Sequence, residues 1–331
     1  MASLGQVRGM LLEEIVLRFL EANGYTAIDT AGSDPTLIDG HSGLEVRGRA
    51  TPHQIDAIAN YRFTPPFSHP YRLLVEAKSL DKPVGLNVIR NALGVLRDVS
   101  EYWNSKDEPR FHYQYAVFTD TRFTEPAQTF GYVQDIFLLP LAKARSMAPV
   151  LEALRAIGPE DVTAIGGASA LKNVRTAFRA ALRNGGVAMA DIGFSGALLA
   201  AAQHVGQALI GMTLNGLPLF LVPSDGVDVT TLQDQEIRVM WNDESWYIES
   251  LENRRLFSFD LPEQLFDLYA KRGQLTERRA LNLKQEALAE IQATVFNGSD
   301  ARVLRFVLDI QWIETVRAQI EERRSRSPRP E

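Results

Sequence analysis

Glu76 and Lys78 stand two residues apart directly after a short apolar segment, and their side chains make them the first candidates for chemistry. The composition of residues 73–75, together with the proline before them, predicts a strand. In a strand, residues two apart lie on the same face, so the carboxylate and the ammonium would emerge together. Such a pair can serve catalysis, or it can be a surface ion pair worth under about 1 kcal/mol.

A second acidic residue, Asp56, lies upstream in residues 53–60, where alternating apolar and polar side chains predict another strand. A carboxylate on a mostly buried strand is costly unless it is paired, hydrogen-bonded or bound to a metal. If the two strands are neighbours, Asp56 and Glu76 converge beside Lys78. The chain contains no cysteine, and two hard oxygen ligands favour Mg²⁺ or Mn²⁺ over zinc.

The order of Asp56 and then Glu76-Ala77-Lys78 resembles the PD-(D/E)XK nuclease superfamily, which has the restriction-endonuclease-like fold, and most closely its Mrr-type members. Ile55 occupies the position of the proline that gives the motif its first letter. The resemblance covers residues 6–142. It implies that Asp56 and Glu76 hold Mg²⁺, with the Ala77 carbonyl as a further ligand. It also implies that Lys78 positions or deprotonates the attacking water, or offsets charge on the phosphorane.

The first expected element is an amphipathic helix over residues 6–22, which ends at Asn23-Gly24. Glu13 shares a face with the apolar stripe, so we expect it to point inward, whereas we expect Glu14 to be solvated. In Mrr-type nucleases a glutamate of the first helix reaches the metal site, and the resemblance implies this role for Glu13. The alternative is an acid at the edge of the stripe that reaches solvent. The stripe consists of Leu12, Val16, Phe19 and Leu20.

Several polar residues around these elements are candidate contacts to nucleic acid. Arg47 and Arg49 share one face of a strand predicted over residues 44–49, where a solvated face is an equally good interpretation. The resemblance implies that a helix predicted over residues 84–103 can reach the site, and this makes its polar residues Asn87 and Arg90 candidates. The complete set of candidates is Arg47, Arg49, Gln54, Asn87 and Arg90.

The rest of the first 142 residues completes the α/β pattern. We expect a strand over 112–119, a helix over 123–130 and a strand over 136–140. The resulting order of helix, three strands, helix, strand, helix, strand is the one expected of the restriction-endonuclease-like core. The sequence therefore predicts a mixed sheet flanked by helices in domain 1–142.

Residues 143–322 contain no recognisable catalytic motif and predict an α+β domain. Helices are expected over 142–157, 169–183 and 195–209, and Asn215-Gly216 predicts a tight hairpin. An antiparallel meander and two long helices, over 276–296 and 300–324, would follow. Such a domain suits recognition, sensing or dimerisation, through self-association or a regulatory protein partner. Residues 323–331, rich in Arg, Ser and Pro, predict a disordered tail. The strands of the meander are expected over 236–241, 246–251 and 256–259.

Composition limits the classes of function. The 331 residues carry a formal charge of −6, and residues 1–142 hold 13 basic against 17 acidic side chains. This balance argues against coating nucleic acid by bulk electrostatics, so a local basic rim and a bound metal would have to do the docking. The sequence shows no signal peptide and no membrane span, which predicts a cytoplasmic protein.

The sequence as a whole predicts a metal-dependent endonuclease that acts on nucleic acid, with DNA ahead of RNA, in bacterial restriction or anti-phage defence. One alternative is a ribonuclease, including a tRNA-cleaving defence effector, that uses the same site. Another is a module that binds nucleic acid or protein without cleaving it.

Overall fold

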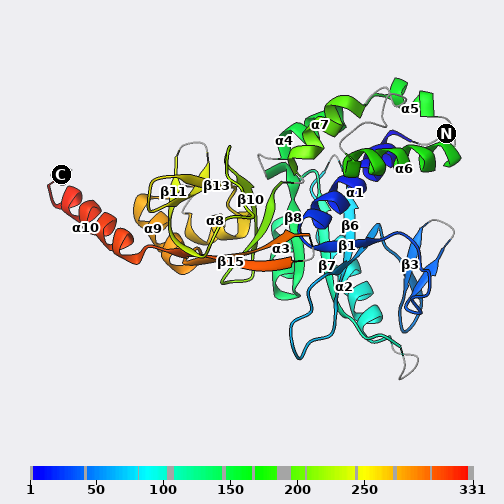
Figure 1. The fold of residues 1–331 in the computed structure, drawn as a ribbon, viewed down its shortest axis with the longest axis horizontal. Coiled ribbons are helices and arrows are strands. Elements are labelled where there is room, and N and C mark those ends of the chain that lie inside the picture. Colours follow the sequence, from blue (N-terminus) through cyan, green and yellow to red (C-terminus); the bar gives the residue numbers. More distant parts are fainter. Residues whose placement is uncertain are drawn as a thin grey trace. The chain divides into compact units, whose positions relative to one another are not determined.

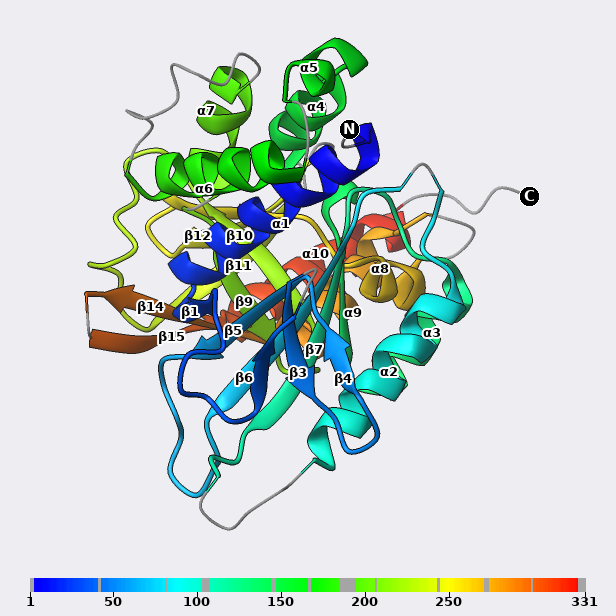
Figure 2. The same cartoon turned by 90° about the vertical axis from the view of Figure 1, so that its right-hand side faces the viewer.

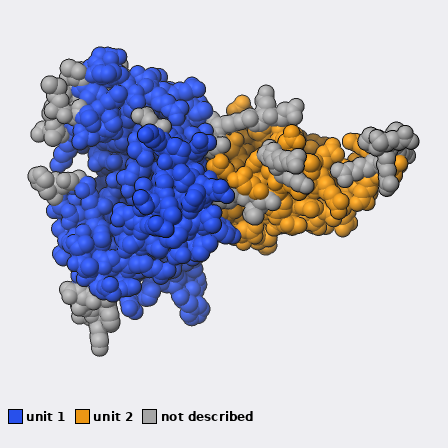
Figure 3. All heavy atoms as spheres, turned by 180° about the vertical axis from the view of Figure 1, so that it is seen from behind, with its two compact units in different colours: residues 1–207 blue, residues 208–331 orange. Residues whose placement is uncertain are grey.

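The computed structural model divides the chain into two compact units, residues 1–207 and 208–331, which Figure 3 shows in different colours. This division falls after residue 207, later than the domain boundary predicted after residue 142. The structure describes residues 3–40, 43–80, 82–102, 108–143, 147–165, 168–184, 195–205, 207–242, 245–270, 274–298 and 300–326.

The first unit is built on a five-stranded mixed sheet with the strand order β1-β5-β6-β7-β8 (Figure 1). β5 runs antiparallel to both β1 and β6, whereas β6, β7 and β8 run parallel to one another. The mixed α/β class is thus confirmed, and β7 and β8 occupy the predicted limits. The strands are β1 (Tyr25–Ile28), β5 (Ala57–Tyr61), β6 (Tyr71–Lys78), β7 (His112–Thr119) and β8 (Ile136–Pro140).

Helices cover both faces of this sheet (Figure 2). On one face α1 (Leu4–Ala22) packs against β1, β5 and β6. On the other face α2 (Leu86–Ser100) and α3 (Glu125–Val133) lie over β7 and β8. The helix predicted over residues 84–103 is shorter at both ends, and Trp103 lies outside the described residues. The core under α2 and α3 includes Leu74, Val117, Ile89, Ala92 and Val99.

A separate three-stranded antiparallel sheet contains β2 (Leu37–Asp39), β3 (Leu44–Arg47) and β4 (Pro52–Gln54). The single strand predicted over residues 53–60 is wrong, because its first half belongs to β4 and its second half to β5 of the large sheet. Alternation of side chains continues through Ile55 and Asp56, so the pattern could not reveal that the chain changes sheets there.

Four helices after the large sheet also belong to the first unit. α6 packs along α1, and α4 packs against α7. The helices predicted over 142–157, 169–183 and 195–209 correspond to α4, α6 and α7. The segment contains a short 3-10 helix η1 (Leu141–Lys143), α4 (Ala148–Ala156), α5 (Pro159–Ile165), α6 (Ala168–Asn184) and α7 (Ser195–Val205).

The second unit is a closed barrel of seven strands in the order β10-β13-β12-β11-β15-β14-β9, an architecture that the sequence analysis did not predict. The predicted hairpin and meander are both confirmed within it, and Gly216 in the hairpin turn has a φ of +74°. The strands are β9 (Leu209–Thr213), β10 (Pro218–Pro223), β11 (Gln235–Trp241), β12 (Trp246–Ser250), β13 (Arg255–Phe259), β14 (Glu290–Asn297) and β15 (Asp300–Leu308).

The two long helices predicted near the end of the chain are wrong. α8 (Glu263–Tyr269) and a short α9 (Glu277–Glu286) precede the β14–β15 hairpin, and α10 (Ile310–Arg326) follows it. Gly298, with a φ of +61°, lies in the hairpin turn. Residues 323–326 of the predicted tail are helical, and residues 327–331 lie outside the described part. Among the described residues, the helices are too short or too polar to cross a bilayer.

Candidate functional site

Asp56 and Glu76 lie beside each other at the end of β6. In the antiparallel ladder Ala57 pairs with Val75, so the next position in this register places Asp56 opposite Glu76. The backbone N–H of Ala77 donates to Asp56 Oδ2 at 2.9 Å, and this bond holds the carboxylate although it precedes β5. Lys78 Nζ lies 2.6 Å from Glu76 Oε1. The structure therefore brings the three residues of the predicted motif together.

Tyr115 on the neighbouring strand β7 holds the second oxygen of Glu76. Its hydroxyl donates to Glu76 Oε2 at 2.9 Å. Burial raises the pKa of Tyr115, and the adjacent Glu76 raises it further, so the hydroxyl stays protonated at neutral pH. The sequence analysis missed this residue. The parallel register that pairs Leu74 with Tyr115 would have been needed to find it.

The charges of the cluster influence one another. Burial raises the pKa of Asp56, although the Ala77 hydrogen bond and the Lys78 ammonium act in the opposite direction. Burial alone would lower the pKa of Lys78, but the ion pair with Glu76 and the charge of Asp56 outweigh burial, so this pKa is raised. In this arrangement Lys78 is an ammonium at neutral pH and has no lone pair with which to accept a proton.

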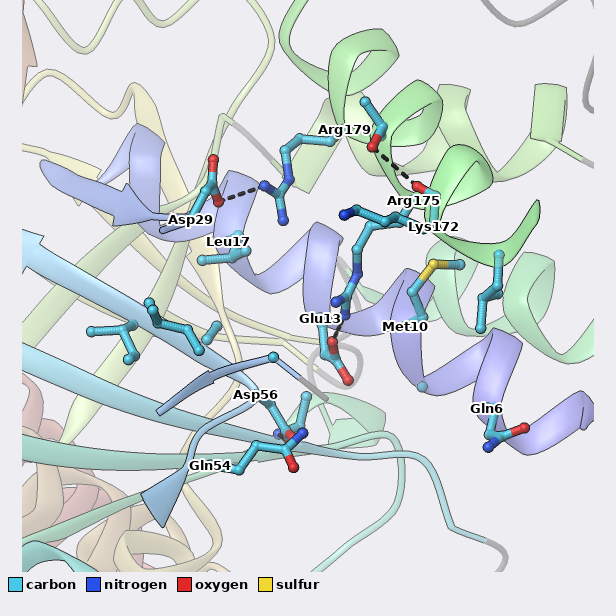
Figure 4. Close-up of a pocket in the computed structure, with 18 of the residues that line it drawn as sticks. Gln6, Met10, Glu13, Leu17, Asp29, Gln54, Asp56, Lys172, Arg175 and Arg179 are labelled. Atoms are coloured by element: carbon cyan, nitrogen blue, oxygen red, sulfur yellow. Dashed lines mark hydrogen bonds and ion pairs between the residues drawn. The ribbon is translucent and has the colours of Figure 1, made fainter. Parts of the chain in front are cut away.

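A cavity of about 1220 Å³ opens over the cluster (Figure 4). Asp56, Ala77 and Lys78 line it from the large sheet, whereas Glu76 is not among the described residues of its lining. Glu13 lines it from α1, as the resemblance implied. In Figure 4 the Glu13 side chain lies between Asp56 and the side chains of α6. Glu13 is ion-paired with Arg175 of that helix.

Glu14 is buried, so the prediction that it is solvated is wrong. Its side chain is 1% exposed and receives a bidentate ion pair from Arg179, with distances of 2.5 and 2.8 Å. Arg175 Nε lies 3.1 Å from the same carboxylate. Burial raises the pKa of Glu14, and the Arg179 guanidinium opposes this shift. The prediction that Glu14 faces solvent failed because α6 covers the side of α1 that the sequence pattern assigned to solvent.

Of the five candidate contacts to nucleic acid, only Gln54 lines the cavity. Arg47 Nε donates to the Pro35 carbonyl at 3.0 Å. Arg49 forms a 2.6 Å ion pair with Glu101. The guanidinium of Arg90 lies 6.0 Å from the centre of the Phe130 ring, and Asn87 lies on α2 outside the described lining.

The donors at the end of β6 fit a hard divalent cation. Among the described residues there is no group of three or more acidic or histidine side chains that could hold a metal. Mg²⁺, however, is usually held by one or two carboxylates, with the other positions filled by water and substrate phosphate. Asp56 and Glu76 supply two carboxylates in a site where burial makes an unneutralised charge costly.

The fold and the site define a mixed α/β protein whose first unit holds two carboxylates and a lysine at the end of a central strand. No family model matches the chain, and no curated protein matches it in sequence. One similar solved structure is described as "Crystal Structure of Protein of Unknown Function AF1548". The match covers 60% of this chain and 97% of the other chain, with 18% sequence identity and a TM-score of 0.29. This likeness carries no functional argument.

Proposed function

We propose that the first unit is a metal-dependent nuclease of the PD-(D/E)XK superfamily, similar to Mrr-type enzymes, and that it hydrolyses phosphodiester bonds of DNA. The observation that supports this proposal is the meeting of Asp56 with Glu76-Ala77-Lys78 beneath a cavity that Glu13 also lines. Two carboxylates and a lysine at the end of adjacent strands are the groups that the motif requires.

Each residue then has a distinct role. Asp56 and Glu76, with the Ala77 carbonyl, would hold Mg²⁺, which polarises the phosphate and lowers the pKa of bound water. Tyr115 orients Glu76, and the Ala77 N–H orients Asp56. These two hydrogen bonds keep the carboxylates in place without substrate.

Lys78 would act through its charge. Lys78 lies at the cavity wall as an ammonium ion-paired with Glu76, and its positive charge suits the negative charge that develops on the phosphorane. Of the three roles that the resemblance left open, this structure favours charge stabilisation over deprotonation of water. Glu13, now paired with Arg175, would help to orient the groups around the cavity.

The biological setting belongs to the same proposal and rests on the resemblance alone. It comprises a role in bacterial restriction or anti-phage defence and a cytoplasmic location. For the second unit we propose self-association or the binding of a regulatory partner.

The test is cleavage by the purified full-length protein of plasmid, linear DNA, total RNA and tRNA, with Mg²⁺, Mn²⁺ or EDTA. We expect DNA cleavage that EDTA abolishes and that Glu76→Gln and Lys78→Ala each reduce by at least about 10²-fold. Glu101→Gln removes an exposed carboxylate outside the cavity and serves as the control. Full activity of Glu76→Gln and Lys78→Ala would refute the site, and cleavage of RNA alone would identify a ribonuclease.

A further inference from the structure

The helix α6 presents a basic face to the cavity of the proposed nuclease. Lys172, Arg175, Thr176 and Arg179 all line this cavity, and their spacing of three and four residues places them on one side of the helix. Figure 4 shows Arg175 directed at Glu13 with Lys172 beside it, and Arg179 directed at Asp29. The sequence analysis had assigned α6 to a different domain and so did not consider it.

The described lining of the cavity becomes positively charged when a divalent cation is added. Among the described residues, the lining has four acidic and four basic side chains, which sum to a formal charge of zero. A bound divalent cation would make it positive by two charges, and this favours a polyanion over a neutral ligand. The acidic side chains are Glu13, Asp29, Asp39 and Asp56, and the basic ones are Lys78, Lys172, Arg175 and Arg179.

The basic residues of α6 differ in how many of their donor nitrogens already contact a carboxylate. Each guanidinium nitrogen of Arg179 donates a hydrogen bond to Glu14 or Asp29. Arg175 contacts Glu13 and Glu14 through Nη2 and Nε, so Nη1 has no partner among the described residues. Lys172 is exposed, and its ammonium likewise has no partner within the described part of the chain. Two donors thus stay available at the cavity wall.

We propose that Lys172 and Arg175 bind the phosphodiester backbone of the nucleic acid that enters this cavity. This inference rests on the proposed nuclease function and names the residues that position its substrate. Ammonium and guanidinium groups are the usual partners of phosphate oxygens, and such contacts position the polymer without reading its sequence. The sequence analysis proposed Arg47, Arg49 and Arg90 as nucleic-acid contacts, but they lie outside the described lining. The residues of α6 take over that role.

The salt dependence of binding distinguishes a phosphate contact from a structural role. The full-length protein is titrated with a labelled DNA duplex and with an RNA of the same sequence, with Ca²⁺ in place of Mg²⁺, over a range of salt concentrations. Each phosphate contact contributes about 0.9 to the slope of log affinity against log salt for duplex DNA, and about 0.7 for single strands. We expect Lys172→Ala to make the slope shallower by that amount and Lys172→Arg to restore it.

Arg97→Ala provides the matched control, because Arg97 is an exposed cation on α2 outside the lining and its removal changes the net charge equally. Arg175→Gln should also reduce the slope. An unchanged slope in Lys172→Ala, with cleavage by the unmodified protein intact, would overturn this inference and leave the nuclease proposal standing. No binding and no cleavage of either polymer would overturn both. Binding of RNA alone would support the phosphate contact and change the identity of the polymer.

Discussion

Asp56 is a partly buried carboxylate with a raised pKa, and this shift predicts how the stability of the fold depends on pH. When the pKa of an acid is higher in the folded state than in the unfolded chain, its ionisation destabilises the fold. This cost is absent below the ordinary pKa of 3.8 and grows as the pH rises from there through the folded-state pKa. Asn at this position keeps an oxygen that can accept the Ala77 hydrogen bond.

We therefore expect Asp56→Asn to raise the melting temperature in EDTA at pH 7 by about 2–4 °C, which corresponds to roughly 1 kcal/mol. The gain should shrink towards zero as the pH falls below 4. Glu152→Gln, at an exposed position on α4, controls for the loss of one carboxylate. A lower melting temperature at pH 7, or a gain that is the same at every pH, would contradict the assigned cause.

Tyr115 tests whether the carboxylates are pre-oriented for a cation. Tyr115→Phe removes the hydroxyl that donates to Glu76 Oε2 and leaves the buried ring in place. Loss of such an orienting bond weakens metal affinity by about 10–100-fold. The concentration of Mg²⁺ needed for half-maximal cleavage should rise by at least about tenfold. Tyr132→Phe, at a position 53% exposed, is the matched control, and equal Mg²⁺ dependence in both variants would contradict the role.

At the scale of elements, the docking of α6 on α1 depends on the buried carboxylate of Glu14. Arg175 and Arg179 both contact it, so Glu14→Ala removes the shared partner of two arginines. Breaking a buried ion pair costs about 3–5 kcal/mol. Urea unfolding should show a loss near the lower end of this range, because Arg175 keeps Glu13 and Arg179 keeps Asp29. Glu101→Ala, which breaks an exposed pair, should cost under about 1 kcal/mol.

In the second unit α9 carries a buried lysine. Lys284 is 8% exposed, and burial lowers its pKa from 10.5 to about 8. Its ammonium lies 5.0 Å from the centre of the Trp312 ring and 5.8 Å from that of Trp246, contacts that offset part of the cost of burial. Below pH 8 both folded and unfolded states are charged, so the full cost applies. It disappears as the pH rises to 10.5, where both states are neutral.

Lys284→Met should therefore stabilise the protein at pH 7 by on the order of 3 kcal/mol, a gain that declines between pH 8 and pH 10.5. Arg278→Met, at an exposed position on the same helix, is the control for the loss of a cation. Thermal unfolding over this pH range provides the measurement. A stabilisation that persists above pH 10.5 would show that packing, and not the charge, is responsible.

The elements that the sequence predicted well are those with one dominant pattern. β7 contains the apolar run Tyr115–Phe118, and Asn215-Gly216 specifies a tight turn, so both were located correctly. β14 was assigned to a helix although Ile291, Ala293 and Val295 are buried at every second position. The charged segment before it, which forms α9, led to the prediction of a single longer helix over both elements.

At the scale of the whole molecule, the sequence located the motif residues but not everything around them. Asp56, Glu76 and Lys78 meet because Asp56, directly before β5, lies opposite the end of β6 in the antiparallel ladder. The contribution of α6 depends on tertiary packing over more than 150 residues of chain, as between Glu13 and Arg175. No local pattern records such a contact, so the cavity wall opposite the sheet could not be predicted.

The closed barrel of the second unit restricts how another protein can attach to it. In its described part each of the seven strands has a neighbour on both sides, including the parallel contact between β11 and β15 that completes the ring. In an open sheet, a second chain can pair its backbone with the edge strand and extend the sheet. A closed barrel has no edge strand with which another chain could pair. If the second unit binds a second copy or a regulator, recognition must proceed through surface side chains. Substitutions of surface residues will therefore change the choice of partner more readily than substitutions that alter strand pairing.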